Sequence, residues 1–181
     1  MQQILKYTVL FLFLGLYACG SGPGYNAVQV PDGKTVILVG TTGFESLKEP
    51  PFADWFDPAY AAFTLEQSKI DAMKPLLEDV RILVFMGTWC EDSHRELPKF
   101  VKILKATNYP IEEVDVVAMT REKTTPQEYE EGLNITNIPT FIFFKDGEEL
   151  GRIVEFPIED LESDMVTILS GKPYKHAYDW D

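Results

Sequence analysis

The sequence is poor in cysteine, histidine and basic residues. Its 181 residues include two cysteines and two histidines, and 16 lysines and arginines stand against 29 acidic residues, for a formal net charge of -13. Nucleic-acid binding needs a basic face and none is visible, so we exclude nucleic acid as a partner. Two distant histidines and so few thiols do not supply three or four convergent ligands, so we expect no metal site and no cofactor.

Long apolar runs and internal repeats are also missing. The apolar segment at residues 7–16 has the length of a secretory h-region and is too short for a membrane span. The hydrophobic content of 45% is ordinary for a globular protein. The chain length therefore suits one domain with its own core, preceded by a leader.

The end of this leader resembles the lipobox of bacterial lipoproteins. Lys6 precedes the apolar segment, which ends LYAC at Cys19. The resemblance implies that residues 1–18 are a signal peptide, that acylated Cys19 anchors the protein to a membrane, and that residues 19–33 form a tether. An ordinary cleaved signal and an uncleaved anchor are the alternatives. We expect a location in the cell envelope facing an extracytoplasmic space such as the periplasm, where disulfides persist.

Beyond the tether, hydrophobic periodicity predicts strands that alternate with helices and then a hairpin. An Asp-Gly pair at residues 146–147 is typical of a tight hairpin turn. The early strands are expected to pair in parallel through crossovers, with antiparallel strands added on one side. Strands are predicted at residues 34–39, 81–86, 112–119, 135–144 and 150–156, helices at 58–78, 91–105 and 158–170, and a charged loop or short helix at 120–132.

The chain is organised around residues 81–100, RILVFMGTWCEDSHRELPKF. The apolar run stops at Gly87, and apolar residues then recur with helical spacing, so Cys90 is predicted where a strand becomes a helix. The free N–H groups and the positive dipole end of a helix favour a thiolate, which is the reactive form of cysteine. The alternative is that Cys90 is an inert small core residue.

Three features of the sequence resemble the thioredoxin superfamily. The run VFMGTWC ending at Cys90 looks like the family's central strand and its Trp-Cys turn, and Pro98 matches the proline of the following helix. Downstream, NIPTF at residues 137–141 looks like the cis-proline segment, followed by the hairpin FFKDGEELGRI. The resemblance implies an α/β, thioredoxin-like fold over residues 34–171, with a central mixed sheet, a C-terminal antiparallel hairpin and flanking helices. Residues 172–181 form a tail to which we assign no function.

The leader and the long segment before the Trp-Cys strand resemble those of thioredoxin-family lipoproteins of Bacteroidetes-type bacteria. Two departures from the family pattern matter for chemistry. Ser93 stands where the second, resolving cysteine would be, and Val84 stands where classical members carry a buried acid. Without a second thiol, Cys90 has no intramolecular partner that could release a trapped substrate.

Five further residues are expected around Cys90, of which Ser93 and His94 follow from their helix positions and Trp89, Ile138 and Pro139 from the resemblance. Ser93 is expected to donate a hydrogen bond to the sulfur, and His94 to stabilise the thiolate or move a proton. Trp89 is expected to flank the sulfur, and cis Pro139 to present the Ile138 backbone to a substrate strand. The alternatives are a plain first-turn serine, an outward-facing histidine and a trans proline at a strand edge.

These residues predict a membrane-anchored protein that acts through one nucleophilic cysteine in thiol-disulfide exchange on client proteins, as an isomerase or a monothiol reductase. A second hypothesis is a peptide-binding or assembly module without redox turnover, and a third is a redox sensor. The aromatic segment at residues 52–60 is either core packing or a surface that faces the substrate.

Overall fold

The computed structural model describes residues 25–180, and their strands form one six-stranded mixed sheet in the order β1-β2-β4-β3-β5-β6. The predicted signal peptide, Cys19 and the first part of the tether lie outside the described residues. The strands are β1 Val28–Asp32, β2 Thr35–Thr42, β3 Val80–Met86, β4 Asp115–Ala118, β5 Thr140–Lys145 and β6 Glu148–Val154. The α-helices are α1 Ala53–Ala62, α2 Gln67–Met73, α3 Glu91–Thr107 and α4 Leu161–Leu169, and the 3-10 helices are η1 Phe44–Lys48, η2 Lys74–Leu76 and η3 Ile111–Glu113.

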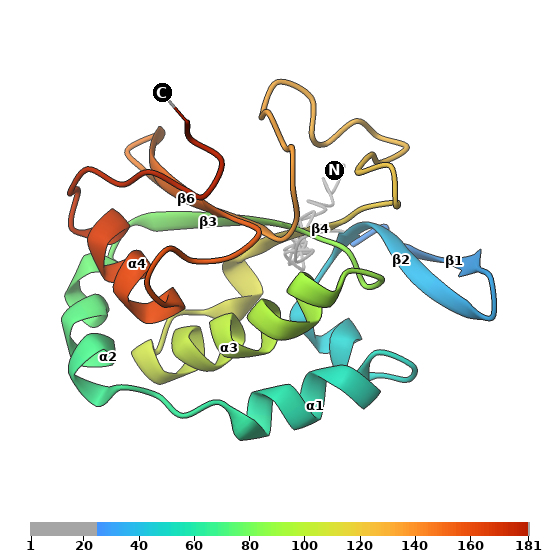
Figure 1. Cartoon of the computed structure of the whole chain (residues 1–181), viewed down its shortest axis with the longest axis horizontal. Helices are drawn as coiled ribbons and strands as arrows, with labels where there is room; N and C mark the ends of the chain where they lie inside the picture. The colour runs from blue at the N-terminus through green and yellow to red at the C-terminus, as the bar shows by residue number, and fades with distance from the viewer. Residues whose placement is uncertain (1–24, 181) are drawn as a thin grey trace, which may run out of the picture.

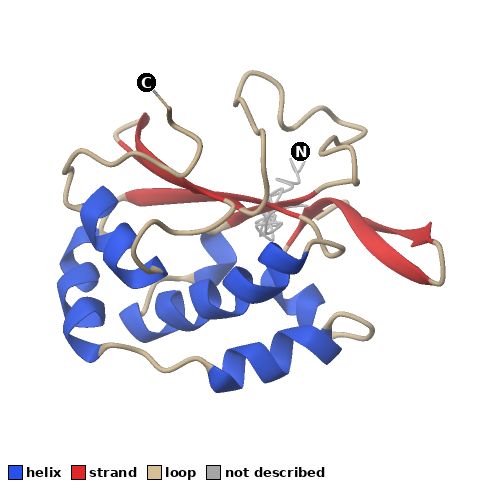
Figure 2. Ribbon diagram, viewed as in Figure 1, coloured by secondary structure: helices blue, strands red, loops and turns tan. Residues whose placement is uncertain are grey.

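The helices gather on one face of the sheet, and the long loop at residues 119–139 rises from the other (Figures 1 and 2). Only β3 and β4 are paired in parallel, while β5 and β6 close the sheet as an antiparallel hairpin. This arrangement confirms the predicted α/β class with a central mixed sheet and a C-terminal hairpin. Because β3 lies between β4 and β5, the segment that leads to Cys90 runs through the middle of the sheet.

Strand β3 is buried on both faces. Successive side chains of a strand point to opposite sides, so Val84 and Met86 pack in the helix-side core, whereas Leu83 and Phe85 join a second apolar cluster. Side chains from residues 119–139 cover that second cluster. This double burial explains why the strand appears in the sequence as an unbroken apolar run.

An N-terminal hairpin occupies part of the range predicted as a tether. Strands β1 and β2 pair antiparallel around a two-residue turn at Gly33 and Lys34, where Gly33 has a φ of 64° that suits glycine. The sequence signal is Gly33 at the first position of its turn, whereas the Asp-Gly pair predicted at residues 146–147 occupies both positions of its turn. The strand signal is weak because β1 has five residues, contains Pro31, and carries only two valines, which are exposed and take no part in the core.

The predicted parallel pairing of the first strand is wrong. Strand β2 pairs antiparallel with β4, with Gly40 opposite Ala118 and Thr42 opposite Val116. A single helical crossover would return the chain to the end where β2 began and make the strands parallel. Here the chain after β2 turns back through residues 43–52 before α1 begins (Figure 1), and this additional reversal inverts the direction of β3 relative to β2.

The single helix predicted at residues 58–78 is two helices, because other elements bind the backbone at the break. The Lys102 ammonium of α3 donates to the carbonyls of Tyr60 and Phe63, at 2.9 and 2.5 Å, which satisfies the end of α1. The Glu162 carboxylate of α4 accepts from the backbone N–H of Glu66, at 2.9 Å, before α2 begins. The partners are 39 and 96 residues away, so no local pattern announces the break.

Glu162 is expected to make stability depend on pH. Burial raises the pKa of its carboxyl above 4.5, against the lowering effects of the Glu66 N–H and Lys69. Well below pH 4.5 the carboxyl is protonated in both states. As the pH rises through 4.5 the unfolded chain ionises first, so stability falls until the folded carboxyl has also ionised. In urea unfolding, we expect the change in the free energy of unfolding caused by Glu162→Gln to be more favourable at about pH 7 than at about pH 4. An equal effect at both pH values would contradict this account, and Glu148→Gln, at an exposed position of β6, is the control.

The C-terminal helix begins later than predicted. The Asp160 carboxylate accepts from the Ser163 N–H at 2.9 Å and caps α4, so the helix starts at Leu161. Ile158, predicted on its buried face, is 58% exposed. The tail returns to the domain where the Tyr174 hydroxyl donates to the Asp164 carboxylate at 2.7 Å.

Candidate functional site

Cys90 occupies the predicted junction between strand and helix. Strand β3 ends at Met86, residues 87–90 form a turn (the 87–90 turn), and α3 begins immediately afterwards, so that Cys90 is its N-cap residue. The Cys90 N–H donates to the Gly87 carbonyl at 3.0 Å, and the Cys90 carbonyl accepts from the His94 N–H at 3.0 Å. These bonds tie the residue to the strand on one side and to the helix on the other.

Gly87 allows two side chains to close over the 87–90 turn. A Cβ at this position would lie 2.8 Å from Ile138 Cδ1 and 2.8 Å from the Trp89 ring, closer than such contacts normally come. Glycine therefore permits the cis-proline segment and the Trp89 side chain to approach the turn that carries the thiol. The sequence showed this glycine only as the end of an apolar run.

Two long-range hydrogen bonds hold the turn against neighbouring strands. The Thr88 hydroxyl accepts from the Leu38 N–H of β2 at 3.0 Å, and Trp89 Nε1 donates to the Met119 carbonyl at 3.0 Å. Both join residues at least 30 positions apart, so the orientation of Trp89 is fixed by tertiary contacts. Thr88 is a site residue that sequence reasoning missed, and no local signal could have found it.

Ser93 has a different partner from the one predicted. Its side chain is fully buried, and its hydroxyl accepts from the Gly87 N–H at 3.2 Å. The expected bond was a donation to the Cys90 sulfur. Because the third residue of the helix lies under the preceding turn, its short side chain reaches the Gly87 backbone there, and Ser93 braces the 87–90 turn.

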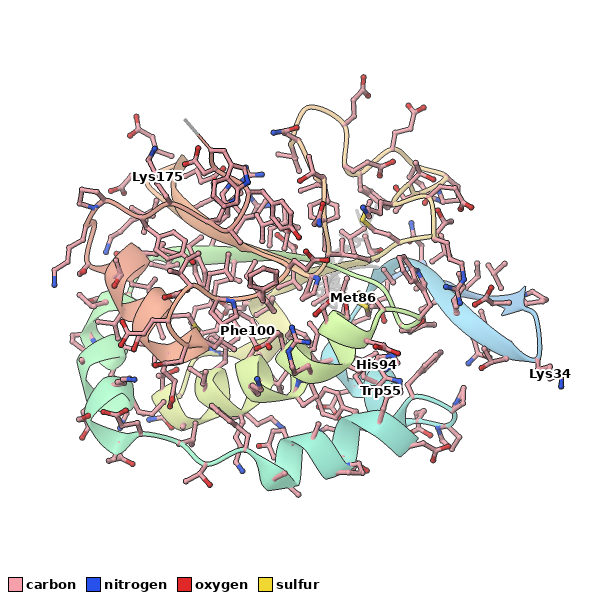
Figure 3. All side chains as sticks on the ribbon, viewed as in Figure 1. Lys34, Trp55, Met86, His94, Phe100 and Lys175 are labelled. Carbon is pink, nitrogen blue, oxygen red and sulfur yellow. The ribbon has the colours of Figure 1, made fainter. Side chains whose placement is uncertain are left out.

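His94 also points elsewhere than predicted. Its Nε2 lies 2.8 Å from the Thr88 carbonyl, so this nitrogen carries the proton of the hydrogen bond. Its ring stacks on Trp55, with centroids 4.1 Å apart and planes 15° from parallel. Figure 3 shows the two rings side by side between α1 and the first turn of α3. The imidazole therefore forms part of the wall of a neighbouring cavity, where its stacking on Trp55 of α1 holds it.

The cis-proline segment meets the thiol as expected. The peptide bond between Ile138 and Pro139 is cis, both residues are buried, and Cys90 Sγ donates to the Ile138 carbonyl at 3.4 Å. The structure thus brings Cys90, Trp89 and the Ile138 backbone together, although Ile138 is 48 residues away in sequence.

The surroundings of the sulfur are mostly apolar. Cys90 is a free thiol, 9% exposed, within the cluster that contains Phe85, Met119 and Ile142. Of the two acids that follow it, Asp92 is paired with Arg95 at 2.5 Å. Any reactant must therefore reach the thiol through the small part of its surface that stays exposed.

A family profile described as thioredoxin matches residues 55–167, which is more than half of the chain. The chain belongs to the thioredoxin family. Position 84, where the classical acid is replaced, is a fully buried valine in the thioredoxin domain's core. The β1-β2 hairpin lies outside the matched residues.

Comparison with solved structures gives two distant similarities. One is the 1.5 Å crystal structure of a protein of unknown function from Pseudomonas aeruginosa, with 16% identity, a TM-score of 0.39, and coverage of 68% of this chain and 99% of that one. The other is the crystal structure of an HIV epitope-scaffold, with 18% identity, a TM-score of 0.33, and coverage of 66% and 88%. No match was found among curated proteins.

Within residues 25–180, no helix combines the length and apolar character needed to cross a bilayer. In the same part of the chain, no group of three histidine, cysteine or acidic side chains is arranged to hold a metal ion.

Proposed function

We propose that this thioredoxin-family protein acts on client proteins by thiol-disulfide exchange through the single cysteine Cys90. The observation that carries the proposal is the placement of Cys90 Sγ at the N-terminus of α3, 3.4 Å from the carbonyl that precedes cis Pro139. A client strand lying along this segment would bring its own sulfur to the thiol.

The exchange proceeds in two steps. The Cys90 thiolate attacks one sulfur of a client disulfide, forming a mixed disulfide and releasing the second client sulfur as a thiolate. A different client thiolate then attacks the client sulfur of the mixed disulfide, which forms a new client disulfide, releases the Cys90 thiolate and gives isomerisation. Alternatively, one external thiolate attacks the Cys90 sulfur and releases the client as a dithiol, and a second external thiolate then releases Cys90 and leaves as the external disulfide, which gives reduction. Ser93 cannot perform the second step, so release depends on the client or the external thiol.

The proposal extends to location. Cys19 would carry a lipid anchor, and the thioredoxin domain would face the extracytoplasmic side of a membrane in the cell envelope, with the periplasm as the favoured space. The supporting pattern is the apolar leader that ends LYAC at Cys19. A space in which disulfides persist would supply clients with disulfides and thiols.

A second candidate function is a peptide-binding or assembly module without redox turnover. It is favoured by the burial of Cys90, which is 9% exposed, and by the engagement of Ser93 and His94 away from the sulfur. In that case the cis-proline segment would hold a partner strand, and the thiol would only pack against it.

The test uses the full-length chain with Cys19→Ser, in detergent, so that Cys90 is the only thiol. The reduced protein is mixed with a peptide disulfide at neutral pH, and adducts are followed by intact mass under non-reducing conditions. We expect one mixed disulfide per chain, released by added glutathione. If the native chain forms no adduct while the urea-unfolded chain does, the thiol is inaccessible and the exchange function is wrong.

A further inference from the structure

A cavity of about 240 Å³ lies beside Trp89 and is separate from the Cys90 sulfur. Its walls come from the β1-β2 hairpin, from the segment around the start of α1, from the 87–90 turn and from α3. We call it the Trp55 pocket. It is next to the residue that precedes the thiol, yet Cys90 is not among the side chains that line it.

Aromatic rings form two of its walls. Trp55 and His94 stack on each other, and the hydrogen bond from His94 Nε2 to the Thr88 carbonyl holds the pair in place. Trp89 forms another wall and is held by its bond to the Met119 carbonyl. Both walls are fixed before any ligand arrives, so little ordering is required on binding.

The rim of the pocket carries one positive and one negative side chain, so its net charge is zero. Arg121 lies over the Trp89 ring, at 5.2 Å from its centroid, and forms a bidentate pair with Asp32 of β1. The hydrogen bond from Arg121 lowers the pKa of the Asp32 carboxyl. The carboxylate therefore stays ionised beside the guanidinium. Each charge is thus already satisfied, and the floor contributed by Val36 and Phe52 is apolar.

The size of the pocket suits one side chain. Sites for cofactors and drug-sized ligands usually run from about 300 to 1,000 Å³, so 240 Å³ is small for such a molecule. The volume equals several waters at about 30 Å³ each in the liquid. A space of this size, with aromatic walls, an apolar floor and a rim whose two charges are paired, is therefore matched by one large uncharged side chain.

We propose that the Trp55 pocket binds one aromatic side chain of the client polypeptide whose sulfur Cys90 engages. This inference rests on the proposed function. The protein would prefer clients with a phenylalanine or tyrosine near the reacting cysteine. The β1-β2 hairpin supplies part of the pocket and lies outside the residues matched by the family profile, so the preference does not follow from family membership alone.

The experiment measures non-covalent binding and covalent capture with the same peptides. Each peptide carries one cysteine in an alanine-serine background, and a single phenylalanine is moved stepwise along it. Non-covalent binding is measured with the full-length Cys19→Ser, Cys90→Ser double variant and with peptides in which serine replaces the cysteine. Capture uses the Cys19→Ser chain. We expect at least one register to bind and react about tenfold better than the alanine peptide, as one large apolar group in a fitted pocket does.

Two variants remove the pocket in different ways. Thr35→Phe fills its mouth from an exposed position of β2, and Trp55→Ala removes a wall. Matched controls are Gln29→Phe, on an exposed position of the same hairpin, and Trp180→Ala, at a tryptophan that is 85% exposed. The pocket variants are expected to reduce the phenylalanine preference to less than about twofold, and the controls to keep it.

The outcomes separate the two proposals. A phenylalanine preference in binding without any covalent capture would support the pocket and overturn the exchange function. Capture at equal rates for all peptides, with no preference in binding, would overturn the pocket and leave the exchange function standing. A preference that survives in Thr35→Phe, whose fold does not depend on a buried residue, would place the aromatic side chain elsewhere and overturn the inference.

Discussion

Replacing Phe100 with alanine is expected to lower the free energy of unfolding by about 3–5 kcal/mol, because the substitution loses apolar burial and leaves a cavity that rigid neighbours cannot fill. Phe100 is fully buried on α3, and its ring centroid lies 4.5 Å from that of Phe141 and 6.3 Å from that of Phe143, both on β5. A third ring, Phe44 of η1, lies 6.4 Å away. The side chain therefore joins the helix layer to the sheet and to the segment that follows β2.

Urea unfolding followed by circular dichroism measures this loss. Phe156→Ala is the matched control, since that ring is 41% exposed and is expected to cost less than about 1 kcal/mol. A loss for Phe100→Ala as small as that of the control would mean that the aromatic cluster does not hold α3 on the sheet. Because α3 carries Cys90 at its N-terminus, the same variant is also expected to weaken the site.

Replacing Cys90 with serine is expected to reduce catalysed disulfide rearrangement to the uncatalysed rate. The hydroxyl keeps a donor for the Ile138 carbonyl, which Cys90 Sγ contacts at 3.4 Å, but it is not a nucleophile toward disulfide sulfur. The fold is therefore expected to remain while the chemistry is lost. The measurement is the recovery of activity by a test enzyme with scrambled disulfides, with glutathione present, in the Cys19→Ser background.

The comparison with Trp180→Ala shows whether the loss is specific, because that exposed tail residue is remote from the thiol's apolar cluster. Equal rates for the wild type, Cys90→Ser and buffer alone would favour the binding module over exchange chemistry. In that case peptide binding, measured without any thiol, would be the property that Cys90→Ser leaves intact.

The sequence predicted those parts of the fold in which local pattern and burial agree. Strand β3 and helix α3 came within two residues of their predicted ends, because both carry continuous apolar signals that the core requires. The turn at Asp146 and Gly147 has positive φ at both positions, as an Asp-Gly hairpin demands. The cis bond before Pro139 followed from the family resemblance.

The errors share a physical cause, which is competition from distant partners. The break between α1 and α2 depends on Lys102 and Glu162, and the direction of β2 depends on how residues 43–52 reverse the chain. Strand β1 is short, contains Pro31 and is exposed, so its sequence carries little strand signal. None of these interactions leaves a periodic signal in the segment that it shapes.

The sequence by itself determined that one cysteine stands at the start of a helix after the central strand, without a second thiol and without an acid at position 84. Those are matters of residue identity and local spacing, which folding does not change. Only the tertiary structure decided what surrounds that cysteine. Ser93 accepts from the Gly87 backbone, and His94 bonds to the Thr88 carbonyl and stacks on Trp55, so the hydrogen bonds of both side chains are directed away from the sulfur. The thiol donates its hydrogen bond to the Ile138 carbonyl, and the aromatic pocket beside it is built in part by a hairpin outside the residues that the family profile matches.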